Sequence, residues 1–308
     1  MKDHVYIIGA GAIGKALAVF LRLNGRLVTL LRGSEDVAET YTERITVMLE
    51  GTEVEAPVRI SSLSNFRSID GLIVLTCKSY GNEGLATAIK NKSGDSPVVL
   101  LQNGLGVERP FEKKGFPGIY RCVLFVTSQV LDDGKVRFKP VADCPVGTVS
   151  GNTRQLAAIA GQLTTDYFAF TAEPDIQPVI WKKAIANCVF NSVCPLLEID
   201  NGIFHRNDQV LAIANQIIAE CLIIAAAKGV KVSHEEILES LIRISRFSDG
   251  QLISTLQDIR LGRRTEIETL NLAIAGMAEE LGMGHLVQGT RLLGEITRLK
   301  SELTLKNP

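Results

Sequence analysis

Residues 5–14 read VYIIGAGAIG, an apolar run that leads into three glycines spaced as GxGxxG. In such a turn the first glycine allows a tight bend, the second lets a pyrophosphate approach the backbone, and the third lets a helix pack on a sheet. Residues 12–23 follow with apolar side chains on one helical face. The order strand, turn, helix predicts a dinucleotide site with the pyrophosphate at the helix N-terminus. A glycine-rich turn without a ligand is the alternative. The residues expected to hold the pyrophosphate are Gly9, Ala10, Gly11, Ala12, Ile13 and Gly14.

Further strand-like runs follow the glycine turn at residues 27–31, 72–76, 98–101 and 122–127, separated by helical or loop segments. Runs with apolar residues at both odd and even positions indicate a parallel sheet that is covered on both faces. Residues 128–151 read as an antiparallel hairpin that ends the sheet, with its turn at Asp-Asp-Gly, residues 132–134. The first half is therefore expected to be an α/β domain with a Rossmann-type doubly wound sheet.

The pattern of apolar residues along the chain changes after about residue 173. Helical apolar periods occupy residues 181–193, 210–228, 233–247 and 265–281, and strand patterns stop. Ser233 and Glu236 have the spacing of a capping box, and Gly229 and Gly282 stand where helices would end. We expect two domains, a Rossmann-like dinucleotide-binding domain over residues 1–173 and an all-α substrate and catalytic domain over residues 174–308.

Composition excludes several classes of protein. The chain has 308 residues, 46% of them hydrophobic, and a net charge of −1, so neither global disorder nor an electrostatic match to nucleic acid or a membrane surface is expected. Six cysteines without a CxxC pair and four scattered histidines predict free thiols in a reducing compartment and no metal site. The N-terminus lacks the pattern of a signal peptide, and no uncharged apolar run reaches 18 residues. A cytoplasmic protein is expected.

The choice of dinucleotide depends on the end of the second strand, where an NAD site has an acidic residue for the ribose. Arg32 stands there instead, with Ser34 close behind. A guanidinium suits the 2′-phosphate of NADP through charge-assisted hydrogen bonds. Glu35 and Asp36 are rival ribose ligands slightly further on, and a solvated surface charge is the plain alternative for Arg32.

Polar residues also follow the next two strands. Lys78 comes directly after residues 72–76, and Gln102 and Asn103 come after residues 98–101. Ligands of open α/β sheets bind beyond the carboxyl ends of the strands, so these side chains are candidates for holding a nicotinamide, a ribose or an anionic substrate. An ordinary Asn-Gly turn and a solvated lysine are the alternatives.

The segment WKKAIANCVFNSV, residues 181–193, has polar residues at every fourth position: Lys183, Asn187 and Asn191. These three lie on one face of an otherwise apolar helix, where an ammonium and two amides are costly unless they have partners. The stripe predicts either a polar contact between packed elements or a site in which Lys183 acts as a general acid.

A second candidate patch runs from Ser254 to Glu268. Thr265 and Glu268 have capping-box spacing, which would give Glu268 a structural role. Glu266 has no such role, although an acid in a first helical turn is favourable in any case.

Together these segments resemble the ketopantoate reductase (2-dehydropantoate 2-reductase) family, over nearly the whole chain and in order. The motifs that carry the resemblance are GAGAIG, LLRGS, TCKSY, QNGLG, WKKAIANCVFNSV and STLQDIRLGRRTEIE. The resemblance implies a Rossmann domain followed by a helical domain, with the active site between them. It also implies NADPH-dependent reduction of 2-dehydropantoate to pantoate, a step toward pantothenate and coenzyme A.

The resemblance assigns roles to individual residues. Arg32 and the glycine turn would bind NADP, and Lys78 and Asn103 would lie at the nicotinamide end. Lys183 would be the general acid, and Glu266 would complete the catalytic site. The substrate-binding residues would be Asn103, Lys183, Asn187, Asn191, Asn201 and Ser254.

Other functions remain open at this point. The family helix commonly continues Asn-Pro-Leu where this chain has Asn191-Ser192-Val193, so a reductase of another 2-oxo acid is an alternative. A dinucleotide-binding sensor without activity is a further one. The partner expected is a small 2-oxo acid, with no nucleic acid and no membrane. The apolar helices of the second half could pack within the monomer or form a homodimer.

Overall fold

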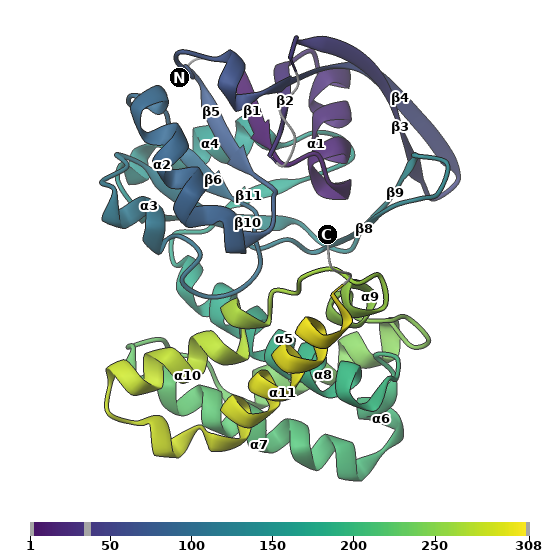
Figure 1. The fold of residues 1–308 in the computed structure, drawn as a ribbon, viewed down its shortest axis with the longest axis vertical. Coiled ribbons are helices and arrows are strands. Elements are labelled where there is room, and N and C mark those ends of the chain that lie inside the picture. The colour runs from purple at the N-terminus through teal and green to yellow at the C-terminus, as the bar shows by residue number, and fades with distance from the viewer. Residues whose placement is uncertain (1–2, 34–37, 306–308) are drawn as a thin grey trace. The chain divides into compact units, whose positions relative to one another are not determined.

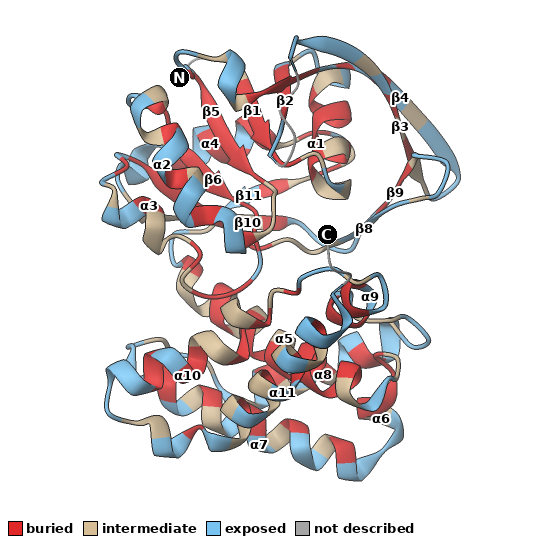
Figure 2. Ribbon diagram, viewed as in Figure 1, coloured by how far each residue is buried: buried red, intermediate tan, exposed pale blue. Residues whose placement is uncertain are grey.

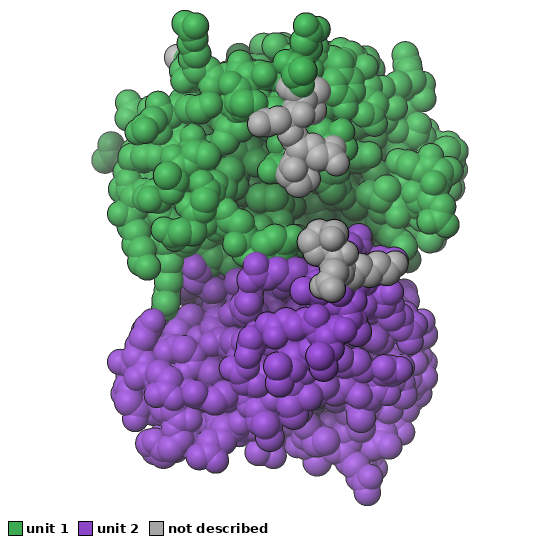
Figure 3. Space-filling view, in the orientation of Figure 1, with its two compact units in different colours: residues 1–102, 107–176 green, residues 103–106, 177–308 purple. Residues whose placement is uncertain are grey.

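The structure of the protein is a computed structural model that describes residues 3–33 and 38–305. It divides into two compact units (Figures 1 and 3). The sheet unit comprises Met1–Gln102 and Val107–Ile176, and the helical unit comprises Asn103–Gly106 and Gln177–Pro308. The short segment Asn103–Gly106 thus belongs to the helical unit, although its neighbours in sequence belong to the sheet. Separate domains divided at residues 173/174 remain a prediction.

One mixed sheet organises the first unit, in the order β11-β10-β7-β6-β5-β1-β2-β4-β3-β9-β8. Its middle, from β4 to β7, is parallel, as a doubly wound sheet requires. Antiparallel pairs occur toward the edges, between β3 and β4, β8 and β9, and β7 and β10. The strands are β1 (His4–Ile8), β2 (Leu27–Arg32), β3 (Tyr41–Leu49), β4 (Thr52–Ser62), β5 (Leu72–Leu75), β6 (Val98–Leu100), β7 (Ile119–Cys122), β8 (Val126–Val130), β9 (Val136–Pro140), β10 (Cys144–Ser150) and β11 (Phe170–Ala172).

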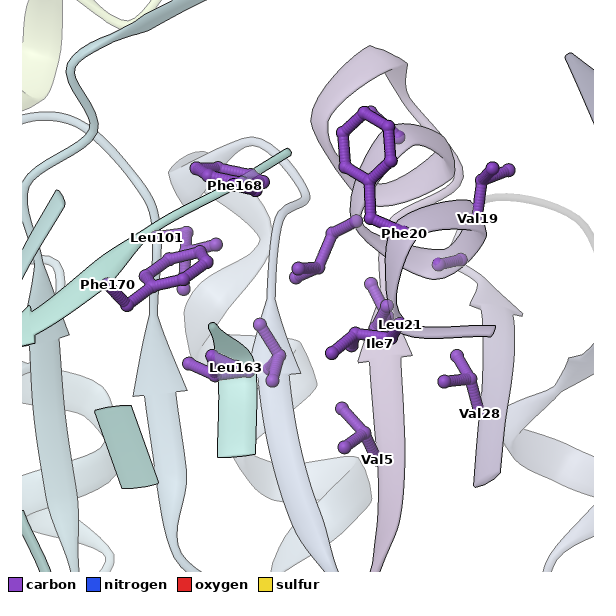
Figure 4. Close-up of a cluster of buried hydrophobic side chains, with 14 of the residues drawn as sticks. Val5, Ile7, Val19, Phe20, Leu21, Val28, Leu101, Leu163, Phe168 and Phe170 are labelled. Carbon is purple, nitrogen blue, oxygen red and sulfur yellow. The ribbon is translucent and has the colours of Figure 1, made fainter. Parts of the chain in front are cut away.

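Both faces of the sheet are covered, as the apolar strands predict. In β1, Val5 and Ile7 join the core on one face, which includes residues of α1 (Ala12–Leu23) and α4 (Leu156–Leu163) and is drawn in Figure 4. Tyr6 and Ile8 join the core on the other face, with residues of α2 (Asn82–Ser93) and α3 (Arg109–Lys113). Each such side chain stabilises the fold by roughly 1.5–3 kcal/mol through removal from water. This double coverage fixes β1 and therefore the turn that follows it.

The sheet differs from the sequence-based prediction in two places. The hairpin of β3 and β4 was not expected, because its strands carry many charged residues; its signals are the alternation of Ile45 and Val47 on the buried side and Gly51, with φ +81°, in the turn. The strand expected at residues 122–127 is instead the end of β7 and the start of β8. The hairpin expected after it is confirmed as β8 paired with β9 at the edge of the sheet, while β10 pairs with β7.

The helical unit contains the all-α architecture that the sequence predicts. Its helices are α5 (Ile176–Leu197, which begins in the sheet unit), α6 (Ile203–Arg206), α7 (Asp208–Ala227), α8 (His234–Phe247), α9 (Ser254–Arg260), α10 (Asn271–Glu280) and α11 (Gln288–Thr304). The capping box of Ser233 and Glu236 is present at the start of α8. Gly229 and Gly282 follow α7 and α10 with φ of +77° and +70°, as helix-ending glycines should.

The single helix expected over residues 265–281 is wrong. A short 3-10 turn, Ile267–Thr269, is followed by a break at Leu270, and α10 starts only after it. The Thr269 carbonyl accepts a hydrogen bond from the Leu105 amide at 2.7 Å, so a distant segment uses an acceptor that a continuous helix would have used itself. The expected capping box is also absent at this turn, and Glu268 pairs with Arg264 at 2.7 Å.

Helix α7 has the length and hydropathy of a membrane-spanning helix, a finding that the sequence expectation did not include. Its apolar window has a mean hydropathy of 2.1, yet only 39% of that window is buried. Glu220, in the second half of α7, accepts hydrogen bonds from the backbone amides of Gly289 and Thr290 at 3.1 and 2.7 Å. Buried residues such as Ile217 and Cys221 pack it into the unit, and Figure 2 shows buried and exposed stretches alternating along it. As folded here, α7 is a packed helix with an exposed apolar side.

Candidate active site

The turn between β1 and α1 is built around two glycines that tolerate no side chain. Gly9 has φ +123°, and a Cβ there would clash with the Cys77 backbone nitrogen. A Cβ on Gly14 would clash with the Gly9 carbonyl oxygen. Gly11, in contrast, faces open space, with no atom within 4 Å of an added Cβ. Ala10, Ala12 and Ile13 are half-buried and pack against the core. The turn therefore keeps one open approach to its backbone.

Thr76, directly after β5, holds this turn and was not among the residues expected from sequence. Its hydroxyl donates to the Gly9 carbonyl at 2.8 Å. The Gly9 amide in turn donates to the Leu31 carbonyl at 3.0 Å. The sequence does contain a signal for Thr76, because it is a hydroxyl residue at the end of the apolar strand 72–75, which pairs with the first strand.

The first turn of α1 is prepared for an anion. Gly11 is its N-cap and has no side chain to bond the free amides, and no acidic residue lies in the first turn. Free N–H groups and the helix dipole both favour negative charge at this position. This geometry could accept the pyrophosphate that the sequence predicts here, and the six residues expected to hold it are contiguous in the turn and the first turn of α1.

Arg32 is the last residue of β2 and is exposed beside Ser62, its partner in the register with β4. β2 lies next to β1, so Arg32 stands at the end of the strand that, in sheets of this type, carries the residue for the adenine ribose. Ser34, Glu35 and Asp36, the other residues considered for that role, lie outside the described residues.

Two of the candidate residues, Lys78 at the end of β5 and Gln102 at the end of β6, differ in their burial and hydrogen bonds. Lys78 is half-buried and precedes the short turn Ser79–Gly81. Gln102 is buried, and its amide exchanges two hydrogen bonds of 2.8 Å with the amide of Asn82 and donates a third to the Cys77 carbonyl. Gln102 therefore shapes this edge of the sheet with an amide that is already occupied by the protein.

A buried ion pair supports the same edge. Arg121 in β7 is 2% exposed and pairs with Glu108, and it also donates to the Gln102 carbonyl at 3.3 Å. A buried cation is tolerated only with such partners. A charged residue in the middle of an apolar strand was the sequence signal for this pair.

The segment Asn103–Gly106 carries Asn103 onto the helical unit, next to the segment of Glu266. Leu105 donates to Thr269, as described above, and Gly104 (φ +96°) leaves no room for a side chain against Thr269. The Thr269 hydroxyl donates to the Glu266 carbonyl at 3.0 Å. Asn103, which is exposed, and Glu266, which is half-buried, thus lie on two segments that are bonded to each other.

The polar stripe on α5 has the predicted form. Lys183 and Asn187 are half-buried, whereas Asn191 is buried, and their neighbours Ala184, Ile185 and Cys188 are in the core. The stripe is thus a polar line on a helix that is otherwise in the core of its unit.

The Asn191 amide is bonded at both ends within the unit. Its nitrogen donates to the Asn187 carbonyl at 3.1 Å, and its oxygen accepts from Thr255 at 2.7 Å and from Ser254 at 3.3 Å. Asn191 thus links the first residues of α9, including the exposed Ser254, to the stripe on α5 through hydrogen bonds. Thr255 is a second residue that sequence reasoning missed.

Asn201 lies in a tight turn after α5. It is buried, its backbone amide donates to Gln251 at 2.9 Å, and its carbonyl accepts from the Ser245 hydroxyl at 2.8 Å. Its side-chain oxygen accepts no hydrogen bond from the described residues. The preceding Asp200 accepts from Arg206 at 2.7 Å and from the backbone amide of Gly202 at 2.8 Å, and the Arg206 bond leads in lowering the pKa of Asp200 to about 2.

We expect this pKa to appear in the acid unfolding of the protein. Because the folded pKa lies below the usual 3.8, the Asp200 carboxylate contributes stability that is full above about pH 4 and is lost as the pH falls toward 2. Asp200→Asn should therefore destabilise the protein at pH 7, and its deficit against the unmodified chain should shrink at pH 3, in urea unfolding at each pH. Asp249→Asn, which removes another partner of Arg206, is the control for the arginine contact alone. A deficit that is constant with pH would contradict the assignment.

Comparison with known proteins identifies the family. The model described as "Ketopantoate reductase PanE/ApbA" matches residues 5–151, and the model described as "Ketopantoate reductase PanE/ApbA C terminal" matches residues 175–287. The chain is 29% identical over 276 residues to a 2-dehydropantoate 2-reductase of Pyrococcus horikoshii, covering 87% of this chain and 88% of that relative. It is 26% identical over 302 residues to one of Halobacterium salinarum, covering 96% and 98%.

Solved structures share the fold. A PanE/ApbA family ketopantoate reductase of Ralstonia eutropha JMP134 superposes with a TM-score of 0.84 at 24% identity, covering 98% of this chain and 99% of that one. D-mandelate dehydrogenase with NADH and anilino(oxo)acetate superposes with a TM-score of 0.83 at 23% identity, covering 98% and 100%. Both likenesses concern the fold. With the two family models spanning most of the sheet unit and most of the helical unit, the chain belongs to the ketopantoate reductase family and is an oxidoreductase.

Proposed function

We propose that the protein reduces 2-dehydropantoate to pantoate with NADPH in the cytoplasm, as a step toward pantothenate and coenzyme A. The observation that carries the proposal is the stripe of Lys183, Asn187 and Asn191 on α5, in a chain whose sheet unit has an open GxGxxG turn. Its curated relatives bear the name of this reaction. A sensor without activity would have no use for a half-buried lysine in such a stripe.

The residues of the sheet unit fit a dinucleotide. The open side of Gly11 and the free amides of α1 would hold the pyrophosphate, and Arg32 would bind a 2′-phosphate. Lys78, and Asn103 of the helical unit, would lie toward the nicotinamide. When bound, NADPH supplies the hydride.

The proton and the substrate contacts would come from the helical unit. As hydride reaches C2 of the ketone, negative charge develops on the ketone oxygen, and a Lys183 ammonium aimed at that oxygen stabilises the transition state more than the ground state. The proton passes from Nζ of Lys183 to the oxygen, which becomes the hydroxyl of pantoate. Asn187, Ser254, Asn201 and Asn103 would bind the carboxylate and hydroxyl groups of the substrate.

Glu266 and Asn191 would have different roles from those ligands. Glu266 would hydrogen-bond to the substrate hydroxyl from its place beside the Asn103 segment. Asn191, whose amide is occupied by Thr255 and Asn187, would position Ser254 rather than bind substrate directly.

The test is NADPH oxidation followed by absorbance with 2-dehydropantoate and with a panel of other 2-oxo acids. Turnover that is fastest with 2-dehydropantoate supports the proposal. Turnover confined to another 2-oxo acid moves the substrate and keeps the chemistry. NADPH binding without turnover of any oxo acid supports the sensor instead.

Another 2-oxo acid has one observation in its favour, the departure from the family pattern after Asn191. Ser192 and Val193 are both buried, and the Ser192 hydroxyl donates to the Cys188 carbonyl at 2.7 Å. Their effect on a pocket would therefore act through the shape of α5 and not through direct contact with substrate.

Arg32→Ala should weaken NADPH more than NADH. A charge-assisted hydrogen bond to the 2′-phosphate is worth about 1.5–3 kcal/mol, so we expect KM for NADPH to rise roughly 10- to 100-fold while KM for NADH changes little. Arg44→Ala, which removes another exposed arginine on a strand of the same sheet, is the matched control. Equal effects on the two dinucleotides would show that Arg32 is an ordinary surface charge.

A further inference from the structure

The turn that carries Asn201 is strained and is held from outside. Glu198, three residues earlier, is a non-glycine residue with φ +56°, in the left-handed region. Such a conformation is costly, and it persists only where surrounding contacts over-determine it, which is common at functional sites. Lys300 of α11 makes such contacts, because its ammonium donates to the Glu198 carboxylate at 2.7 Å and to the Pro195 carbonyl at 2.8 Å. The turn therefore leaves the end of α5 in a fixed direction.

The side-chain oxygen of Asn201 has no donor within the described part of the protein. Asn201 is 6% exposed, and this oxygen is buried without a hydrogen bond from the described residues. A buried acceptor without a donor lowers stability, and in a native protein it calls for an explanation such as a bound molecule or a role in the site. The unmet acceptor and the strained turn are independent observations. Both indicate that Asn201 is held in place for a ligand.

Both backbone groups of Asn201 are bonded to the stretch of chain that runs from α8 to α9. The Asn201 carbonyl accepts from the Ser245 hydroxyl in α8 at 2.8 Å, and its amide donates to the Gln251 carbonyl at 2.9 Å. At the other end of this stretch, Ser254 donates to the side chain of Asn191 at 3.3 Å. The stretch therefore connects Asn201 to the polar stripe on α5 within the helical unit.

Ser245 is itself oriented by His205, since its hydroxyl oxygen lies 3.0 Å from Nδ1 of that ring. A carbonyl oxygen only accepts, so the single hydroxyl proton goes to Asn201, and Nδ1 must carry a hydrogen that it donates to Ser245. The Asp249 carboxylate lies 3.8 Å from Nε2, on the other side of the ring. The sequence His205 N–H, Ser245 O–H, Asn201 C=O, here called the hydrogen-bond relay, therefore has a defined direction at each step.

The relay is not a hydrolytic triad, although a serine, a histidine and an aspartate lie in a row. Ser245 is fully buried, so a substrate carbonyl cannot approach its hydroxyl. The His205 nitrogen beside the serine donates a hydrogen, whereas the general base of a triad must accept one. These groups can hold an orientation, but they cannot attack a substrate.

We propose that Ser245 and His205 are positioning residues, which fix Asn201 for contact with the 2-oxo acid through the hydrogen-bond relay. The inference rests on the proposed function, because it takes Asn201 to be a substrate ligand. Both residues act through the backbone of Asn201, so their loss should weaken the binding of the 2-oxo acid. The binding of NADPH to the sheet unit should not depend on them.

Steady-state kinetics with saturating NADPH tests the proposal, with the 2-oxo acid that the unmodified protein reduces fastest. Ser245→Ala should raise KM for that acid roughly tenfold, the effect of one ordinary hydrogen bond, and should lower kcat less. Asn201→Ala should raise KM at least as much. In the double variant, Ser245→Ala should add little, because the residue through which it acts is already gone. Effects on KM that multiply independently would overturn the proposal.

A matched serine separates positioning from a loss of stability. Ser96 in the sheet unit is also buried, and its hydroxyl donates to the Ile69 carbonyl at 3.0 Å and accepts from the Gly71 amide at 3.2 Å. It therefore uses its hydroxyl as Ser245 does, but at the amino ends of the strands. Ser96→Ala should lower Tm as Ser245→Ala does, without a change in KM for the 2-oxo acid.

Two substitutions of His205 test the direction of the relay. His205→Asn keeps an N–H donor near the place of Nδ1, whereas His205→Gln puts its amide near the place of Nε2. The asparagine variant should retain the KM of the unmodified protein, and the glutamine variant should raise it as Ser245→Ala does. Fluorescence titration should show unchanged NADPH affinity in both.

The outcomes distinguish this inference from the proposed function. If a 2-oxo acid is reduced but KM is unchanged in Ser245→Ala, or equal in the two His205 variants, the function stands and the positioning role is overturned. An unmodified protein that reduces no 2-oxo acid overturns both.

Discussion

Replacing Lys183 with alanine should lower kcat for 2-oxo acid reduction by about 10²–10⁴, the usual contribution of a general acid. The lysine is half-buried on α5 and in line with Asn187 and Asn191, so an alanine there removes the ammonium from the stripe and leaves the helix intact. KM should change much less than kcat, because the ammonium acts mainly on charge that develops in the transition state. Steady-state kinetics with saturating NADPH measures both.

The neighbouring residue offers a matched control for this prediction. Lys182 is also half-buried on α5, but its ammonium pairs with Glu236 at 3.3 Å. Lys182→Ala should therefore leave kcat nearly unchanged. Binding of NADPH, followed by fluorescence, should be retained in both variants, which separates a loss of chemistry from a loss of fold. A reduction of kcat smaller than about fivefold in Lys183→Ala would exclude Lys183 as the general acid.

Gly14→Ala should abolish NADPH binding and destabilise the sheet unit. The added methyl group would overlap the Gly9 carbonyl and crowd the Thr76 hydroxyl, which donates to that same carbonyl. Overpacking of this kind typically costs about 1–3 kcal/mol, and here the obstacle is the backbone of the GxGxxG turn itself. Thermal denaturation should show the loss of stability, and a fluorescence titration should show the loss of binding.

Gly11→Ala separates binding from folding at the same turn. Its Cβ would meet no atom of the protein within 4 Å, and its φ of −77° is accessible to alanine. We expect stability to fall by about 1 kcal/mol at most, from the poorer N-cap, while NADPH binding weakens severely because the methyl group occupies the approach of the pyrophosphate. Unchanged NADPH affinity in this variant would mean that the dinucleotide does not use the open side of the turn.

Several features of the molecule could be predicted because short segments carry their own signals. The β1–α1 turn is one, since an apolar run, three glycines and an amphipathic helix all act within a few residues of each other. The capping box at Ser233 is another, because both of its hydrogen bonds close within one helical turn. The stripe on α5 was visible for the same reason, as helical periodicity alone aligns residues at every fourth position.

Other features could not be predicted because they depend on residues distant in sequence. The helix is interrupted at Leu270 because the Leu105 amide donates a hydrogen bond to the Thr269 carbonyl. The sequence near Leu270 contains no signal of that contact. Gln102 looked like a ligand group after a strand, but Asn82 and Cys77 occupy its amide. Asn191 stays a predicted substrate ligand, but the sequence did not indicate that its amide oxygen accepts a hydrogen bond from Thr255 of α9.

The sequence by itself determined a GxGxxG turn between a strand and a helix, followed by a helical unit with a lysine stripe, because local periodicity and turn chemistry are sufficient for these features; the oxidoreductase class follows from the family to which the chain belongs. Only the tertiary structure showed which polar side chains form hydrogen bonds between distant segments and so stabilise the fold. It alone also showed that α11 buries Thr290 and Thr297 and exposes Leu292, Leu299 and Leu303. A helix turns toward the core the face that its neighbours can accommodate, and small side chains such as Gly294 and Ser301 allow the close approach that packing against the rest of the unit requires.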